Sequence, residues 1–272
     1  MVRKRILLAA VLGLWVIGGG WGFGAAAGPA AVTLPYTMSD NQGNQWVFHQ
    51  YGQFQQQGNM PVYGQGGMIQ IAGQYPQARG NSGKIEEKSG ELVLENMTAN
   101  TFTVTRRILL NKEEGMVRYV DIIKNPQNKD QTLNLVLSTN VNYGVQRTSI
   151  VADPKRKEQN LAWIAQTHGN GRTVVELFGG KGAKTVPVIN YVNNNNVVQA
   201  SLSYTVPAGK EIALMHLHCL TTSIDTGTKY VMNLKESKLM SAIPPAIRKL
   251  IINFRGGENF VGDSEILRGD IL

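Results

Sequence analysis

Between residues 91 and 220, apolar and polar positions alternate in short runs that are separated by turn residues. The runs are rich in Val, Ile, Leu, Thr and Tyr, which favour β-strands, and the alternation places every second side chain on one face. No helical pattern interrupts the series, so the sequence predicts a mainly β fold, a large antiparallel β-sandwich. The predicted strands are residues 91–95, 101–110, 116–124, 132–140, 161–166, 173–178, 197–206 and 211–220.

Three turn sequences divide these runs into expected hairpins. They lie at residues 111–115, 168–171 and 207–210, each rich in Gly, Asn, Pro or charged residues. In the first hairpin we expect Leu110 to lie opposite Met116. Arg107 and Asp121 would then be diagonal neighbours on one face, with Tyr119 beside them.

The segments on either side of this core have different patterns. Residues 28–90 are rich in Gln, Asn and Gly, and their apolar islands predict an N-terminal β region. Residues 229–254 form a helical segment, with a second short helix expected to start on Pro245, a residue favoured in the first helical turn. Residues 255–272 return to a strand-and-turn pattern, and we expect them to begin a further unit that is cut short at Leu272.

The first 27 residues have the order of a secretory signal peptide. A basic head precedes an apolar run, and small residues at 25–27 offer a cleavage site after Ala27, with Ala31 as the second choice. The alternative is a retained membrane anchor, because the apolar stretch is close to the shortest that spans a bilayer. Glycines at its end disfavour a helix. We therefore expect export to the periplasm, the cell surface or the extracellular space.

Charge and cysteine content narrow the function classes. The formal net charge of +8 falls to +5 when Arg3, Lys4 and Arg5 leave with the signal peptide. No basic stretch is interleaved with aromatic residues, so a nucleic-acid partner is not expected. Cys219 is the one cysteine. An exported chain without an internal disulfide depends on a large core for its stability.

Several short sequences within the core form a recognisable set. They are Thr-Arg-Arg-Ile at 105–108, Gly-Met-Val-Arg-Tyr-Val-Asp-Ile at 115–122, Lys-Asn at 124–125, Thr-Asn at 139–140, Ala-Trp-Ile at 162–164 and Val-Pro-Ala-Gly at 206–209. This set resembles the β-rich modules of bacterial secreted and surface proteins, of the β-supersandwich type found beside carbohydrate-active domains. Such modules are commonly non-catalytic, so the resemblance implies an architecture and assigns no catalytic residue.

One candidate site is a pair of histidines. His216 and His218 are two residues apart in a predicted strand, so both imidazoles face the same side and could reach one metal ion. A third ligand would come from His49, His168 or a carboxylate. The alternative is that one histidine belongs to the core or the edge of the sheet and the other to the surface.

A second candidate is the group of Arg107, Tyr119 and Asp121. These side chains could hydrogen-bond a sugar or hold a catalytic carboxylate. They could equally stabilise the sheet. An Arg–Asp pair lowers the pKa of the carboxyl group, whereas a general acid needs it raised.

A third candidate is a set of aromatic residues among amides in the N-terminal β region. Trp46, Tyr51, Phe54, Tyr63 and Tyr75 are set among Gln and Gly, a composition that suits stacking on sugar rings. It also suits a self-associating β surface.

Together these patterns favour an exported, non-catalytic β-sandwich that acts as a structural or interaction module of the bacterial cell envelope. The alternative is a carbohydrate-binding or carbohydrate-processing module, and a metal-dependent enzyme is the third interpretation. No cofactor motif is present in the sequence. The expected partners are a polysaccharide or another envelope protein, with membrane contact only through an uncleaved signal segment.

Overall fold

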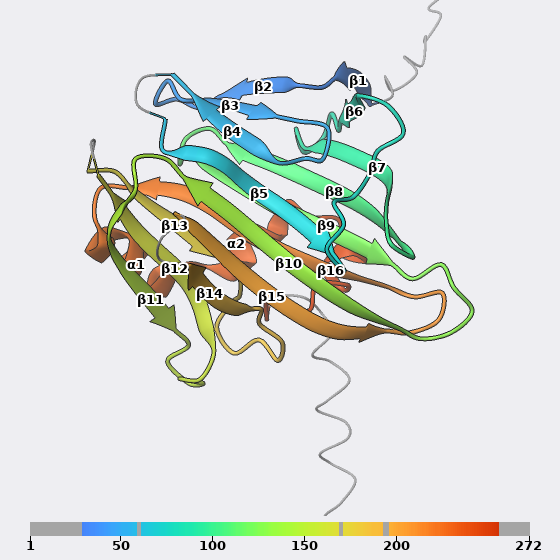
Figure 1. Ribbon diagram of the computed structural model, residues 1–272. Coiled ribbons are helices and arrows are strands. Elements are labelled where there is room, and N and C mark those ends of the chain that lie inside the picture. The colour runs from blue at the N-terminus through green and yellow to red at the C-terminus, as the bar shows by residue number, and fades with distance from the viewer. Residues whose placement is uncertain (1–28, 59–60, 169–170, 193–195, 256–272) are drawn as a thin grey trace, which may run out of the picture.

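In a computed structural model of the protein, residues 29–58, 61–168, 171–192 and 196–255 are described. They form two antiparallel sheets packed face to face and three short helices (Figure 1). This confirms the predicted mainly β sandwich with helices near the C-terminus. The signal peptide expected in residues 1–27 lies outside the described residues, as does the unit expected in residues 255–272 apart from Arg255.

The larger sheet of the described chain has nine strands, and the smaller has seven. The order in the larger sheet is β1 (Ala30–Thr33), β6 (Ser82–Ile85), β7 (Leu92–Ala99), β8 (Phe102–Asn111), β9 (Met116–Lys124), β16 (Glu211–Thr221), β13 (Thr173–Leu177), β12 (Asn160–Thr167) and β11 (Val145–Ala152). The order in the smaller sheet is β14 (Val188–Val192), β15 (Val197–Val206), β10 (Gln131–Val141), β5 (Tyr63–Ile71), β4 (Phe54–Gln57), β3 (Gln45–Phe48) and β2 (Tyr36–Ser39).

Strands from the Gln- and Asn-rich N-terminal region complete both sheets. The apolar islands around Trp46 and Met68 lie in the strands β3 and β5. Trp46 packs against Phe54 and Tyr63 in the core, because every second residue of these short strands faces the opposite sheet. The apolar islands of this region are therefore core positions.

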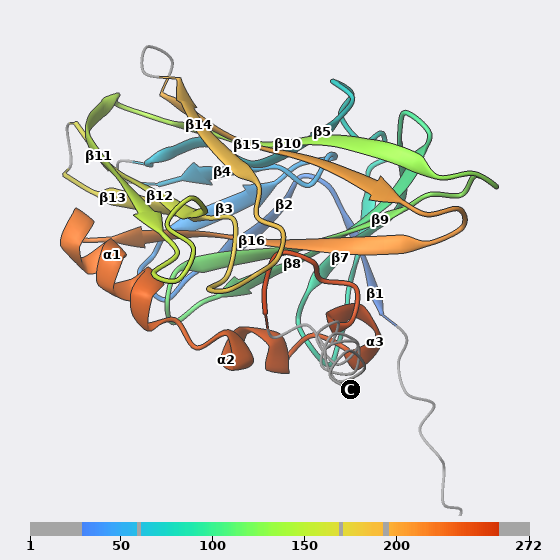
Figure 2. The same ribbon diagram turned by 90° about the horizontal axis from the view of Figure 1, so that it is seen from below.

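Helices cover the outer face of the nine-stranded sheet and make a third layer. They are α1 (Ile224–Asn233), α2 (Glu236–Ser241) and α3 (Pro245–Arg248), and Figure 2 shows them on the side of β16 that faces away from β10 and β15. The helical segment begins earlier than expected, because the Ser223 hydroxyl accepts a hydrogen bond from the backbone N–H of Thr226 at 3.1 Å and caps α1. The predicted start of a short helix on Pro245 is confirmed. No helix among the described residues is long and apolar enough to cross a bilayer.

The register of the β8–β9 hairpin differs by one residue from the expected one. Asn111 lies opposite Met116, so Arg106 lies opposite Asp121, and Arg107 lies opposite Val120. A shift of one residue turns every side chain of a strand to the other face. The expected grouping of Arg107 with Asp121 on one face is therefore wrong, and Arg106 is the arginine that shares the inner face with Asp121.

The turn at residues 207–210 does not close a hairpin, contrary to expectation. β15 pairs with β10 and β14 in the smaller sheet, whereas β16 pairs with β9 and β13 in the larger one. The turn itself is tight, with Gly209 at φ +68° and a Lys210 N–H bond to the Pro207 carbonyl. Turn residues specify a change of direction. They do not specify whether the strands then pair or enter opposite sheets.

Candidate functional site

A chain of five polar side chains crosses the inner face of the nine-stranded sheet. Arg106 Nε donates to Asp121 Oδ1 at 2.7 Å, and Asp121 Oδ2 lies 3.0 Å from His216 Nε2. His216 Nδ1 lies 2.9 Å from His218 Nε2, and His218 Nδ1 lies 2.7 Å from Glu176 Oε2. All five residues are at most 1% exposed. We call this set the buried polar chain.

The pKa values of Asp121 and His216 fix which ring nitrogen of His216 carries its proton. Burial acts to raise the pKa of Asp121, but the positive charge of Arg106 and the hydrogen bond from His216 outweigh it and lower the pKa to about 2. Burial lowers the pKa of His216 to about 4, so this imidazole is neutral at pH 7. Neutral His216 therefore donates from Nε2 to Asp121 and accepts at Nδ1 from His218 Nε2–H.

His218 connects the chain to its last member. Its Nδ1 lies 2.7 Å from Glu176 Oε2, in the hydrogen bond that ends the buried polar chain. Every ionisable group of the set therefore has a hydrogen-bond partner within it, which offsets the cost of burying such groups.

Aromatic rings and the opposite sheet enclose this chain. Tyr119 stacks on His216 at a centroid distance of 4.7 Å, and its hydroxyl lies in the core with a pKa raised by burial. Thr139, from β10 of the smaller sheet, donates to Glu176 Oε2 at 2.6 Å. Glu176 Oε1 has no hydrogen-bond partner among the described residues. The buried polar chain thus links the two sheets through the contact between Glu176 and Thr139 inside the sandwich.

The arginine end of the chain holds the turn between β3 and β4. Arg106 Nη1 donates to the Tyr51 carbonyl at 2.8 Å, and the Tyr119 hydroxyl donates to the Gly52 carbonyl at 2.7 Å. Gly52 has φ +74°, and a Cβ there would lie 3.0 Å from both Arg106 Cδ and Leu94 Cδ1. Two buried side-chain donors therefore hold the backbone of this turn, and the half-buried side chain of Tyr51 packs against the core beside it.

A small cavity opens beside this turn, and we call it the tyrosine pocket. The rings of Tyr51 and Tyr75 are nearly parallel, at 14° and a centroid distance of 6.0 Å. The cavity has a volume of about 150 Å³, and Tyr75 is 38% exposed. Its lining combines two aromatic rings, two amides and two apolar side chains, namely Tyr51, Tyr75, Gln53, Gln65, Met68 and Ile69.

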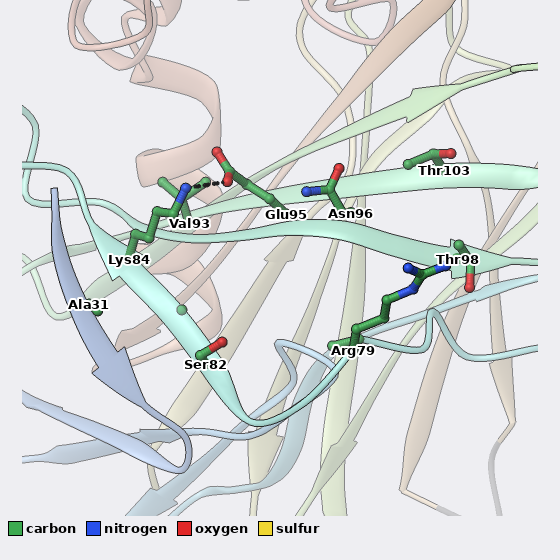
Figure 3. Close-up of a pocket in the computed structure, with 11 residues that line it drawn as sticks. Ala31, Arg79, Ser82, Lys84, Val93, Glu95, Asn96, Thr98 and Thr103 are labelled. Atoms are coloured by element: carbon green, nitrogen blue, oxygen red, sulfur yellow. Dashed lines mark hydrogen bonds and ion pairs between the residues drawn. The ribbon is translucent and has the colours of Figure 1, made fainter.

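A second, wider depression lies over β1, β6 and β7, and we call it the polar cleft (Figure 3). Its volume is about 630 Å³, and it contains Arg79, Asn96 and Thr98. Lys84 and Glu95 form an exposed ion pair across it at 2.6 Å, which satisfies both charges within the protein. None of the described residues that line the cleft is aromatic, so these residues offer no ring on which a sugar could stack.

Arg107, which sequence analysis placed with Asp121, lies instead in an ion cluster on the outer face of the nine-stranded sheet. It contacts Glu91 Oε2 at 2.5 Å and Glu86 Oε2 at 2.6 Å. Arg118, on the adjacent strand, contacts Glu91 Oε1 at 2.5 Å. Glu91 is fully buried and serves both arginines, so the cluster ties β7, β8 and β9 together.

The structure brings together some predicted site residues and separates others. Asp121, His216 and His218 meet in the buried polar chain, and Tyr119 stacks on His216 beside them. All four are at most 1% exposed. Of the five aromatic residues of the third candidate, Tyr51 and Tyr75 line the tyrosine pocket, and Trp46, Phe54 and Tyr63 are fully buried.

Two residues of the buried polar chain were not assigned a role from the sequence. Arg106 lies at an inward-facing position in the apolar alternation of residues 102–110. A charged residue at such a position is the sequence signal that could have identified it as a buried functional group. Glu176, a carboxylate within the apolar strand β13, carries the same kind of signal. A charged residue at a core-facing position requires a buried partner, which these two residues find in Asp121 and His218.

The two histidines share one face, as expected from their spacing, but their ring nitrogens contact each other and carboxylates. No group of three His, Cys, Asp or Glu side chains suited to a metal ion occurs among the described residues. The metal site stays a prediction from the sequence.

Comparison with known proteins gives similarities of structure alone. No protein-family model and no curated protein sequence matches the chain. A candidate kojibiose phosphorylase from the human microbiome has a TM-score of 0.44 at 11% identity, and a heparinase III has 0.45 at 13% identity. A candidate aldose 1-epimerase from Escherichia coli K12 has 0.43 at 8% identity.

The matches differ in how much of each protein they cover. Each spans 71% to 73% of this chain, but they span 28% of the phosphorylase, 37% of the heparinase and 99% of the epimerase. The three proteins bear the names of activities on carbohydrates. Their TM-scores lie below 0.5, so they assign no activity or residue to this chain, and the chain is described by its β-sandwich architecture.

Proposed function

We propose that this chain is a non-catalytic β-sandwich module that binds a saccharide in the tyrosine pocket. The observation that carries the proposal is the pair of nearly parallel tyrosine rings, Tyr51 and Tyr75, set beside the amides of Gln53 and Gln65. Aromatic faces pack against the C–H bonds of a sugar ring. Amide side chains supply both donors and acceptors for its hydroxyl groups.

The size and rigidity of the pocket support binding of a single sugar ring. Its volume of about 150 Å³ is below the roughly 300–1,000 Å³ of sites for drug-sized ligands. The Tyr51 backbone is held at its carbonyl by Arg106 and at its N–H by Gln53 Oε1, at 3.1 Å. A fixed turn reduces the entropy that a ligand must overcome to order its site.

The position of the titratable groups supports a binding role over catalysis. His216, His218 and Glu176 are of residue types that act in acid–base catalysis. Each is at most 1% exposed, however, and each is hydrogen-bonded to another member of the buried polar chain. A general acid or base needs to come within hydrogen-bond distance of a substrate. In this proposal the buried polar chain positions the binding turn through Arg106.

Export to the cell envelope is part of the proposal and is supported by the sequence of residues 1–27. N-terminal sequencing of the protein from a fractionated bacterial culture tests it. We expect an envelope or extracellular protein that begins at Gly28, after cleavage following Ala27. An intact N-terminus in the cytoplasmic fraction would overturn export and leave the binding proposal unaffected.

Saccharide binding is tested by isothermal titration with maltohexaose, cellohexaose and chitohexaose. We expect at least one of the three to bind, and the variants Tyr51→Ala and Tyr75→Ala to weaken its affinity by at least about tenfold, equivalent to roughly 1.4 kcal/mol. The matched control is Tyr143→Ala, which removes a tyrosine that is 46% exposed and lies outside the pocket.

Two results would overturn the proposal. One is the absence of binding to all three hexasaccharides by folded protein. The other is an equal loss of affinity in the Tyr143→Ala control, because binding would then not depend on the tyrosine pocket.

A further inference from the structure

A groove runs between the outer face of the nine-stranded sheet and the helices α1 and α2. It lies on the opposite face of this sheet from the buried polar chain. Its volume is about 680 Å³, within the roughly 300–1,000 Å³ typical of a small-ligand site. Leu109 and Met116, from β8 and β9, line its sheet side, and Leu234 and Leu239 line its helix side. We call it the lysine groove, for the residues at its rim.

An incompletely satisfied arginine forms part of the groove wall. Arg118 is 2% exposed and donates from Nη1 to the Leu239 carbonyl at 2.7 Å and from Nη2 to Glu91. Its Nε has no hydrogen-bond partner among the described residues. Arg118 also shares its one carboxylate, Glu91, with Arg107. A buried donor without a partner is costly, so an acceptor in the groove would be stabilised there.

The rim adds further positive charge. Lys229, Lys235 and Lys238 all line the groove and are exposed. Lys238 pairs with Glu114 at 3.3 Å, whereas Lys229 and Lys235 have no carboxylate within ion-pair distance in the described part of the chain. Glu114 is the single acidic residue among those that line the groove. An apolar interior with a cationic rim is complementary to an anion with an apolar body.

We propose that the lysine groove binds a single-chain alkyl carboxylate. The alkyl chain lies between the sheet and the helices, against Met116 and Leu239, and displaces water from apolar surface. The carboxylate faces the cationic residues of the groove, where charge-assisted hydrogen bonds from Lys and Arg are stronger than those between neutral groups. This site is independent of the tyrosine pocket and of the saccharide proposed there.

The test uses the full chain and a series of fatty acids below their micelle-forming concentrations. Hexanoate, octanoate, decanoate and dodecanoate are titrated by calorimetry, with dodecyltrimethylammonium as a cation of matched chain length. We expect affinity to rise by up to about fourfold for each methylene that is buried, and the cation to bind at least about tenfold more weakly than dodecanoate. In protein with ¹³C-labelled methionine methyls, dodecanoate should shift the Met116 signal, assigned with Met116→Leu, and leave that of Met68 unchanged.

A charge variant and a matched control locate the site. Lys229→Glu/Lys235→Glu changes two exposed rim residues and should weaken dodecanoate binding at least about tenfold. Lys157→Glu/Lys210→Glu makes the same charge change at exposed positions outside the groove and should leave the affinity within about twofold of the unaltered protein.

Three results would overturn the proposal. They are affinity that does not depend on chain length, equal binding of the cationic amphiphile, and equal effects of the two double variants. Binding of an acidic amphipathic peptide in the absence of any dodecanoate binding would assign the groove to a protein partner instead. Because the Met68 and Met116 signals report on different sites, a failure here is distinguishable from a failure of saccharide binding.

Discussion

Acidification from pH 7 to pH 4 should destabilise the protein through His216. Burial in the core lowers the pKa of this imidazole to about 4, whereas in the unfolded chain it returns to about 6.5. Between these two values the unfolded state binds a proton that the folded state does not. The stability that comes from a neutral His216 is therefore complete above pH 6.5 and is lost as the pH falls towards 4.

The magnitude follows from the difference between the two pKa values. Each pKa unit corresponds to about 1.4 kcal/mol, so a difference of about 2.5 units gives a loss of about 3 kcal/mol between pH 7 and pH 4. The slope in the middle of this interval is about 1.4 kcal/mol per pH unit, the value for uptake of one proton on unfolding. Such a loss is a large part of the 5–15 kcal/mol stability of a typical domain.

Urea unfolding at a series of pH values measures this effect. The variant His216→Gln removes the titrating group, so its free energy of unfolding should fall by about 3 kcal/mol less than that of the unaltered protein between pH 7 and pH 4. His168→Gln, at an exposed histidine, is the control and should leave the pH dependence unchanged. Parallel curves for the unaltered protein and His216→Gln would refute the assignment of His216 as a neutral link in the buried polar chain.

Two further predictions concern other buried groups. Arg106→Met leaves the carboxylate of Asp121 buried without its cationic partner, so the free energy of unfolding in urea should fall by about 3–5 kcal/mol. The exposed control Arg147→Met should lower it by less than about 0.5 kcal/mol. Similar small losses in both variants would contradict a buried ion pair between Arg106 and Asp121. Cys219 is 3% exposed and burial raises its thiol pKa, so native protein should resist alkylation by iodoacetamide at pH 8, with one thiol per chain becoming reactive in urea. Rapid alkylation of native protein would place Cys219 at the surface.

The sequence predicted the class of fold because its strongest signal is local. Alternating apolar residues identify strands such as β9, whose predicted bounds match those in the structure. Pairing between strands is not local. The turn at 207–210 has the residues of a hairpin, yet it connects opposite sheets because β10 and β9 are better placed to pair with the strands on either side.

The candidate site could be predicted only in part for the same reason. The spacing of His216 and His218 correctly places both on one face, since it depends on strand geometry alone. Choosing Arg106 over Arg107 as the partner of Asp121 required the register of the hairpin to within one residue. The contact of His218 with Glu176 required knowledge that β13 lies beside β16, which no short-range pattern contains.

The most direct test of the proposed function is the methyl NMR signal of Met68 during a saccharide titration. Met68 lines the tyrosine pocket, and its signal can be assigned with Met68→Leu. Addition of the hexasaccharide that binds in the calorimetric experiment should shift this signal, leave that of Met116 in place, and do so only when Tyr51 and Tyr75 are both present. A saccharide that binds without moving the Met68 signal would contradict the assignment of the tyrosine pocket as the binding site.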